Sequence, residues 1–336
     1  MAAPLSYVGA IRGAVASGLD APASVFAGRV RSWRDTLDRA ARIAGGLRAA
    51  GIAAGDRVGV LSPNNDDYMA LYLAVPWAGA VLVPLNCRWS QAENSFAIED
   101  CRPRLIFVSE DMADANAALL AGEDAPALVS LGKARPGWRT LEDLLASAAI
   151  EDAGRGGDDL LAIFYTGGTT GRSKGVMLSH AGLVANCSAM RDFGLFPPGC
   201  RTLIVPPLFH LAAAATLTTT MLSGGTAVID RAFDPVASLD LIAAERTTDA
   251  MMVPTMIQMM LDAPHSLRRL ADAGSDARSH HGRRTAYRFH PGLWHDRSIV
   301  HRDLAPRRLS SGRPSRGRAA PGRGQGAADR RSEGGR

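Results

Sequence analysis

The sequence predicts an α/β fold in which parallel strands form a sheet with helices on both faces. Three observations lead to this prediction. Helix and strand patterns alternate along the first part of the 336-residue chain, the strand patterns are short and apolar, and hydrophobic residues make up 46% of the sequence. Such alternation is typical of parallel sheets, whose strands are buried on both faces. A chain of this length can bury a large core, as two domains or as one large α/β unit.

Capping residues and hydrophobic spacing define the expected elements in order. Ser32 to Asp35 opens a helix whose apolar residues recur every three or four positions until Gly51 ends it. The next expected elements are a strand at 57–61, a helix at 66–75 capped by Asn64 or Asn65, a strand at 81–85, a helix from Ser90 to about Asp100, and strands at 105–108, 160–164, 202–205, 227–230 and 251–253. Residues 122–157, rich in Gly, Ala and acids, are interpreted as a variable connection.

One uncharged run is long enough to suggest a membrane span. Tyr68 to Leu85 is eighteen residues, the lower limit for a transmembrane helix. Pro76, Gly79 and Pro84 interrupt the run, so a helix, a turn and a buried strand are the preferred interpretation. The N-terminus has no basic cluster before an apolar run and therefore predicts no signal peptide. We expect a cytoplasmic chain without an integral membrane span.

The four cysteines, Cys87, Cys101, Cys187 and Cys200, lie far apart and form no C-x-x-C pair. This spacing favours scattered core thiols in a reducing compartment over a disulfide framework or a zinc site.

The net positive charge of the chain comes from its last 61 residues. Residues 276–336 hold fifteen Arg and five acids, whereas residues 1–275 carry a net charge of −5. Periodicity also disappears after Ser275, so the predicted organisation is a lead at 1–23, a domain at 24–275 and a disordered basic tail at 276–336. The tail has three interpretations: an arm for nucleic acid, a solvated linker, or translation in the wrong reading frame.

The strongest chemical signal is a loop that follows the apolar strand at 160–164. Its three closely spaced glycines let backbone N–H groups turn inward and form an anion-binding concavity, and its hydroxyls and one ammonium group suit a polyphosphate. It is neither a Walker A loop nor a G-x-G-x-x-G fingerprint, and the alternative is an ordinary surface hairpin. The loop reads Tyr165-Thr166-Gly167-Gly168-Thr169-Thr170-Gly171-Arg172-Ser173-Lys174-Gly175.

This loop resembles the phosphate loop of the adenylate-forming (AMP-binding) superfamily, which includes acyl-CoA synthetases, peptide-synthetase adenylation domains and luciferases. That loop usually reads Tyr-Thr-Ser-Gly-Thr-Thr-Gly-x-Pro-Lys-Gly, so Gly167 and Ser173 are departures. Neither change removes a backbone donor, and we expect phosphate contact to survive. Similar segments extend the resemblance over about residues 24–275, roughly half of a full-length synthetase; they are Gly55-Asp56-Arg57-Val58, Ala78-Gly79-Ala80, Val83-Pro84-Leu85-Asn86 and Val253-Pro254-Thr255. The implied fold is an incomplete large N-terminal domain of this superfamily.

The resemblance implies a function and a set of site residues. Such enzymes join ATP and a carboxylic acid into acyl-AMP with release of pyrophosphate, and CoA then takes the acyl group. Thr166, Gly167, Gly168, Thr169, Thr170, Gly171 and Lys174 would bind the phosphates of ATP, and Gly274 and Ser275 would contact adenine. Lys174 is also assigned as a catalytic residue, because the reaction joins two anions and needs cations and Mg²⁺ to offset their charge.

Pro207-Leu208-Phe209-His210 has the form usual in acyl-CoA synthetases, so the resemblance assigns His210 to the acyl pocket, where it would gate or orient the substrate. The alternative is an ordinary core or rim histidine. Five methionines between residues 251 and 260 would line a pliable acyl tunnel, or fill a core.

The resemblance stops after Ser275, where Asp276 replaces an expected Pro. Codons that encode residues 289–298 can spell Phe-Thr-Gln-Ala-Tyr-Gly-Met-Thr-Glu when read one base later, and residues 275–277 can spell Pro-Met-Pro in the same offset. Both strings are superfamily motifs in the right order. The sequence therefore predicts a frameshift between about Ala273 and Ser275, which the gene's nucleotide sequence would decide.

These observations predict an AMP-forming acyl-CoA ligase, with a fatty acid as the preferred substrate, in a truncated copy that is inactive alone. In frame, the chain lacks the Glu that holds Mg²⁺ in the superfamily, the ribose-binding Asp and the catalytic Lys of the C-terminal domain. Three alternatives remain: an enzyme that loads a carrier protein, a non-catalytic nucleotide-binding remnant, and a nucleic-acid binder acting through the tail. The acidic body argues against the last, and we expect no nucleic-acid partner. The sequence does not indicate an oligomeric state.

Overall fold

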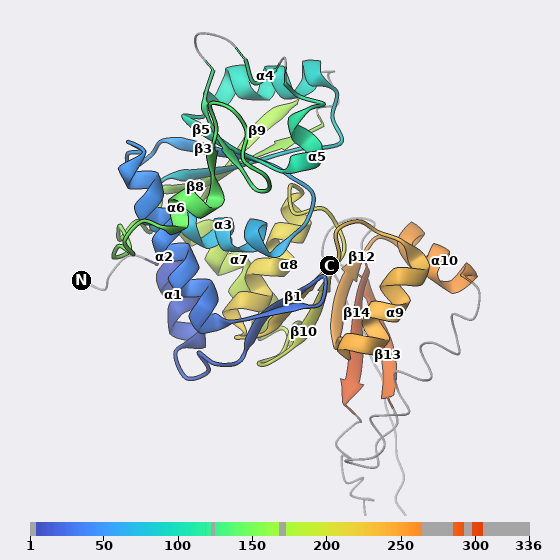
Figure 1. Cartoon of the computed structure of the whole chain (residues 1–336). Helices are drawn as coiled ribbons and strands as arrows, with labels where there is room; N and C mark the ends of the chain where they lie inside the picture. Colours follow the sequence, from blue (N-terminus) through green and yellow to red (C-terminus); the bar gives the residue numbers. More distant parts are fainter. Residues whose placement is uncertain are drawn as a thin grey trace, which may run out of the picture. The chain divides into compact units, whose positions relative to one another are not determined.

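The computed structural model describes residues 5–117, 119–121, 125–167, 173–263, 285–291 and 298–304, the last two ranges by their backbone alone. The strands within these ranges form two seven-stranded sheets (Figure 1). The fold is therefore mixed α/β, as the sequence predicts.

The first sheet carries the predicted phosphate loop. Its strands are parallel except at one edge, where the last two strands pair antiparallel. In spatial order they are β7 (Arg139–Thr140), β6 (Ala127–Ser130), β5 (Leu105–Val108), β3 (Arg57–Leu61), β4 (Val81–Leu85), β8 (Leu160–Thr166) and β9 (Lys174–Ser179).

The second sheet has a parallel centre and antiparallel edges. In spatial order its strands are β13 (Thr285–Pro291), β14 (Ser298–Leu304), β12 (Asp249–Met252), β10 (Arg201–Ile204), β11 (Thr226–Ile229), β1 (Pro22–Phe26) and β2 (Arg29–Ser32).

The helices begin where capping residues place them. Ser32 and Ser90 each form a capping box with the acid three residues later, and Asn65 accepts the N–H of Tyr68. The helices of the described residues are α1 (Tyr7–Val15), α2 (Trp33–Ala49), α3 (Asp66–Trp77), α4 (Gln91–Cys101), α5 (Glu110–Ala113), α6 (Leu141–Leu145), α7 (His180–Asp192), α8 (Leu211–Leu222), α9 (Pro235–Glu245) and α10 (Pro254–Asp262).

Alternation along the central strands places their side chains in separate cores. In β5, Leu105 and Phe107 belong to one hydrophobic cluster, whereas Ile106 and Val108 belong to another. The first of these clusters is the largest and joins one face of each sheet to α1, α2, α3, α7 and α8. The outer face of the first sheet is covered by α4 and α5, and that of the second by α9 and α10 (Figure 1). Both sheets are thus covered by helices on both faces.

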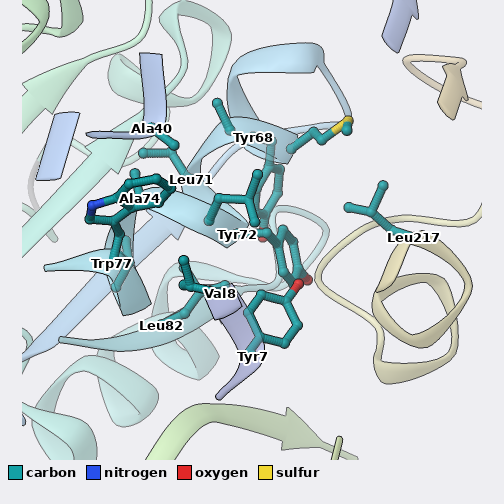
Figure 2. Close-up of a cluster of buried hydrophobic side chains, with 14 of the residues drawn as sticks. Tyr7, Val8, Ala40, Tyr68, Leu71, Tyr72, Ala74, Trp77, Leu82 and Leu217 are labelled. Atoms are coloured by element: carbon teal, nitrogen blue, oxygen red, sulfur yellow. The ribbon is translucent and has the colours of Figure 1, made fainter. Parts of the chain in front are cut away.

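The uncharged run at residues 68–85 forms α3, a turn and β4, as predicted. Every residue of α3 except Asp67 is buried, because the helix lies within the largest core (Figure 2). Its apolar character therefore reflects burial in protein. Among the described residues, no helix combines the length and the hydropathy that crossing a bilayer requires.

Several regions differ from the sequence-based prediction. The strands β1, β2 and β9 and the helices α1, α5, α7, α8, α9 and α10 were not predicted. The segment 122–157 was interpreted as a connection, but it contains β6, β7 and α6. Beyond Ser275 the sequence predicts no regular element, whereas β14 pairs with β12 and β13 pairs with β14. These two strands are defined by backbone pairing, which a local sequence pattern does not report. The rest of the tail and the proposed frame change lie outside the described residues.

Candidate functional site

The predicted phosphate loop joins the two antiparallel strands β8 and β9. Thr166 lies opposite Lys174, and Tyr165 lies opposite Gly175. Residues 168–172 fall outside the described ranges, so the predicted contacts of Gly168, Thr169, Thr170 and Gly171 stay predictions.

Tyr165 fixes the part of this hairpin that lies beside the loop. Its phenol donates a hydrogen bond to Oδ2 of Asp100 at 2.5 Å. Burial, followed by this bond, raises the pKa of Tyr165 above its usual value, so the phenol stays a donor. A Cβ at Gly175 would lie 2.9 Å from Cγ2 of Ile163 and 3.3 Å from Cζ of Tyr165. Close packing therefore favours glycine at position 175.

The described polar groups next to the loop of the hairpin face solvent. Thr166, Gly167 and Lys174 are all exposed. No carboxylate among the described residues forms an ion pair with Lys174, whereas Lys133, the other lysine of the chain, pairs with Glu110 at 2.8 Å. The ammonium group of Lys174 is thus placed to meet an anionic ligand.

His210 lies at the start of α8, in the other half of the fold. It is the N-cap residue of that helix, its N–H bonds the carbonyl of Pro207 at 2.9 Å, and its ring lies 4.5 Å from the ring of Phe209, measured between centroids. The side chain is exposed. The segment Pro207 to His210 thus forms a turn that presents the imidazole outward.

A cavity of about 460 Å³ opens beside His210. Its volume lies within the range usual for small-molecule pockets. The lining includes the buried residues Val205 and Met251, and no acidic side chain of the described residues contributes to it. The cavity is lined by Arg88, Val205, Pro206, Pro207, His210, Ala212, Phe233, Met251, Val253 and Met256. Such a wall suits a ligand with an apolar body and an anionic end.

The five methionines between residues 251 and 260 are distributed among the cavity, a hydrophobic core and the surface. Met251 and Met256 line the cavity. Met252 and Met260 belong to the core beneath α9 and α10, and Met259 is 51% exposed. Two of the five are therefore pocket residues.

The structure adds residues that the sequence did not single out for the pocket. Arg88 and Phe233 line it, and no local pattern marks either of them. Asn64 was considered only as a helix cap, yet its side chain bonds the segment that carries the pocket wall.

Gly274 and Ser275, which the sequence assigns to adenine, lie outside the described residues. Among those described, no His, Cys, Asp and Glu side chains cluster to hold a metal ion, and the four cysteines are free thiols.

Comparison with known proteins connects these features. The AMP-binding enzyme family matches residues 12–297. A feruloyl-CoA synthase from Amycolatopsis sp is 37% identical over 249 residues, which are 74% of this chain and 48% of that protein. The fatty acid–[acyl-carrier-protein] ligase ScoC from Streptomyces coeruleorubidus is 32% identical over 72% of this chain and 47% of its own length.

Solved structures show the same resemblance. ATP-bound MatB from Rhodopseudomonas palustris superimposes with a TM-score of 0.70 at 28% identity, covering 87% of this chain and 61% of that one. The chain spans about half the length of the curated relatives it matches.

Proposed function

Because this chain belongs to the AMP-binding enzyme family, we propose that it provides the ATP-binding hairpin and the acid pocket of an AMP-forming acyl-CoA ligase. The observation that supports this most directly is the apolar cavity beside His210, on a chain that also carries the Gly- and Thr-rich hairpin ending at Lys174. The chain spans about half the length of its relatives, so binding is the property to measure.

The proposed chemistry is the attack of a carboxylate on the α-phosphate of ATP, with release of pyrophosphate. Both reactants are anions, so the protein must supply positive charge and hydrogen-bond donors. Thr166, Gly167 and Lys174, with residues 168–171, would hold the phosphates, and Gly274 and Ser275 would contact adenine. Mg²⁺ bound with ATP would neutralise part of the phosphate charge. The described residues offer no cluster for that ion, and we assign it no ligand.

The proposed substrate is a carboxylic acid with an apolar body. His210 would orient the carboxylate at the mouth of the cavity, and the apolar body of the acid would lie against Val205 and Met251. Fatty acids are the preferred class, because eight of the ten lining residues are apolar and flexible methionines are among them. The similarity to a feruloyl-CoA synthase makes aryl acids the next class to test. CoA is the proposed acceptor, and the similarity to ScoC supports a carrier protein as the second candidate.

Filling the cavity tests this proposal. Ala212 is half-buried in the wall, so Ala212→Phe will place a ring in the space that the acid needs. We expect dodecanoate to bind the wild-type chain and to bind this variant at least about 10-fold more weakly, measured by isothermal titration calorimetry. The control is Ala237→Phe, at an exposed position of α9. Equal affinity of the wild-type chain and Ala212→Phe would show that the acid does not occupy this cavity.

A further inference from the structure

We propose that Asn64 is a positioning residue for the acid pocket: its buried amide connects the two sheets and fixes the segment from Val205 to Leu208, which carries part of the cavity wall and leads into His210. This inference rests on the proposed function of the cavity. It assigns to Asn64 an effect on ligand binding, although Asn64 does not itself line the cavity.

The side chain of Asn64 makes its hydrogen bonds to the other sheet. The residue follows the carboxyl end of β3 and is 1% exposed. Its Nδ2 group faces three carbonyl oxygens, those of Val205 at 3.4 Å, Pro206 at 3.1 Å and Asp230 at 3.2 Å. Its Oδ1 atom accepts the N–H of Leu208 at 2.8 Å. One amide therefore bonds the segment after β10 and the first residue after β11.

The neighbouring residue Asn65 performs a different task. Its Oδ1 atom caps α3 by accepting the N–H of Tyr68 at 2.7 Å, and its Nδ2 group bonds Ser62 and Pro63. Ser62 and Pro63 lie in the β3–α3 connection, and Tyr68 lies in the first turn of α3. The two adjacent asparagines thus separate helix capping from the contact between the sheets, and they form a natural pair for comparison.

The segment after β10 needs an outside partner because of its prolines. Pro206 and Pro207 have no N–H, so the chain cannot continue a strand ladder beyond Ile204. The carbonyl of the buried Val205 and that of the half-buried Pro206 must then find other donors, and the N–H of the buried Leu208 must find an acceptor. The phenol of Tyr72, on α3, supplies one more bond by donating to the carbonyl of Leu208.

The segment from Val205 to Leu208 is bonded both to Asn64 and to the backbone N–H of His210. Asn64 fixes Leu208, and the carbonyl of Pro207 accepts the N–H of His210 at 2.9 Å. The segment therefore has its position set from the first sheet and transmits that position to the start of α8. Loss of the Asn64 amide would remove the Asn64 bonds of the buried carbonyl of Val205 and the buried N–H of Leu208, and the segment would move to reach water. Such a movement displaces Pro206, Pro207 and His210, all of which line the cavity.

The test compares three variants by titration calorimetry with dodecanoate. Asn64→Ala will weaken binding by about 10-fold, and Tyr72→Phe, which removes a single bond to the same segment, will weaken it by about 3-fold. Asn65→Ala loses the cap of α3 and becomes less stable, but its affinity will equal that of the wild-type chain. Urea unfolding of each variant identifies conditions in which all are folded. Methionine methyl NMR will show shifts at Met251 and Met256 in Asn64→Ala and none at the exposed Met177.

The outcomes separate this inference from the proposed function. If the wild-type chain does not bind dodecanoate, the proposed acid pocket is wrong, and the role of Asn64 in it is wrong as well. If the wild-type chain binds and Asn64→Ala binds equally, only the role of Asn64 is wrong. If Asn64→Ala does not fold, Asn64→Asp decides, because it keeps an acceptor for the N–H of Leu208 and removes the donor to the carbonyls of Val205 and Pro206. Unchanged affinity of that variant would overturn the inference.

Discussion

Replacing Lys174 by alanine will lower the affinity of this chain for Mg-ATP by about 100-fold, because a charge-assisted contact with a phosphate contributes roughly 1.5–3 kcal/mol. Lys174 lies next to the loop of the β8–β9 hairpin and has no carboxylate partner among the described residues. Its ammonium group is therefore available to a ligand without first breaking an ion pair. Titration calorimetry with Mg-ATP measures the change directly.

The chain offers a matched control for this substitution. Lys133 is the only other lysine, and it forms a surface ion pair with Glu110. Lys133→Ala removes the same charge from the whole molecule but from a different surface, so it will leave the affinity for Mg-ATP unchanged. Equal losses in both variants would mean that overall charge, and not the hairpin, determines nucleotide binding.

Acidification will destabilise the fold through His180. Burial holds the pKa of His180 near 4, below its ordinary value of 6.5, and its Nδ1 atom accepts the N–H of Tyr7 at 3.3 Å. The unfolded chain therefore binds a proton at a higher pH than the folded chain does. The resulting contribution to stability is fully present above pH 6.5 and is lost as the pH falls towards 4. We expect a loss of about 2 kcal/mol in the free energy of unfolding over this interval.

Urea unfolding of the wild-type chain and of His180→Asn across the same pH interval checks this expectation. Asparagine retains an acceptor for the N–H of Tyr7 but does not titrate. The variant will therefore show a smaller decrease in stability on acidification than the wild-type chain shows. Parallel pH profiles of the two proteins would exclude His180 as the source.

Much of the fold was predictable because its signals are local. The capping boxes at Ser32 and Ser90 depend on residues three positions apart, and the structure forms both. The apolar strands β3, β4 and β5 were predicted for the same reason. The elements within 122–157 were missed because they are short, and β7 has only two residues, whose assignment depends on pairing with β6. The edge strands β13 and β14 likewise depend on pairing, which no local pattern reports.

The candidate site shows the same division between local and distant signals. Lys174 and His210 were assigned as site residues because each belongs to a short motif that can be identified in the sequence, and their roles stay predictions. Asn64 was assigned to helix capping, since its true partners lie 141 to 166 residues away. Arg88 and Phe233 likewise enter the cavity wall only through the fold. Sequence motifs thus suggested Lys174 and His210 as site residues, and the tertiary structure added the residues that line the cavity.

Lysine footprinting tests the central claim, ATP binding at the hairpin, most directly. The chain has two lysines, Lys174 on the hairpin and Lys133 in its ion pair with Glu110, so acetylation followed by mass spectrometry reports the two surfaces separately. Saturating Mg-ATP will slow the acetylation of Lys174 and leave that of Lys133 unchanged. Acetylation of Lys174 at the same rate with and without Mg-ATP would contradict the account.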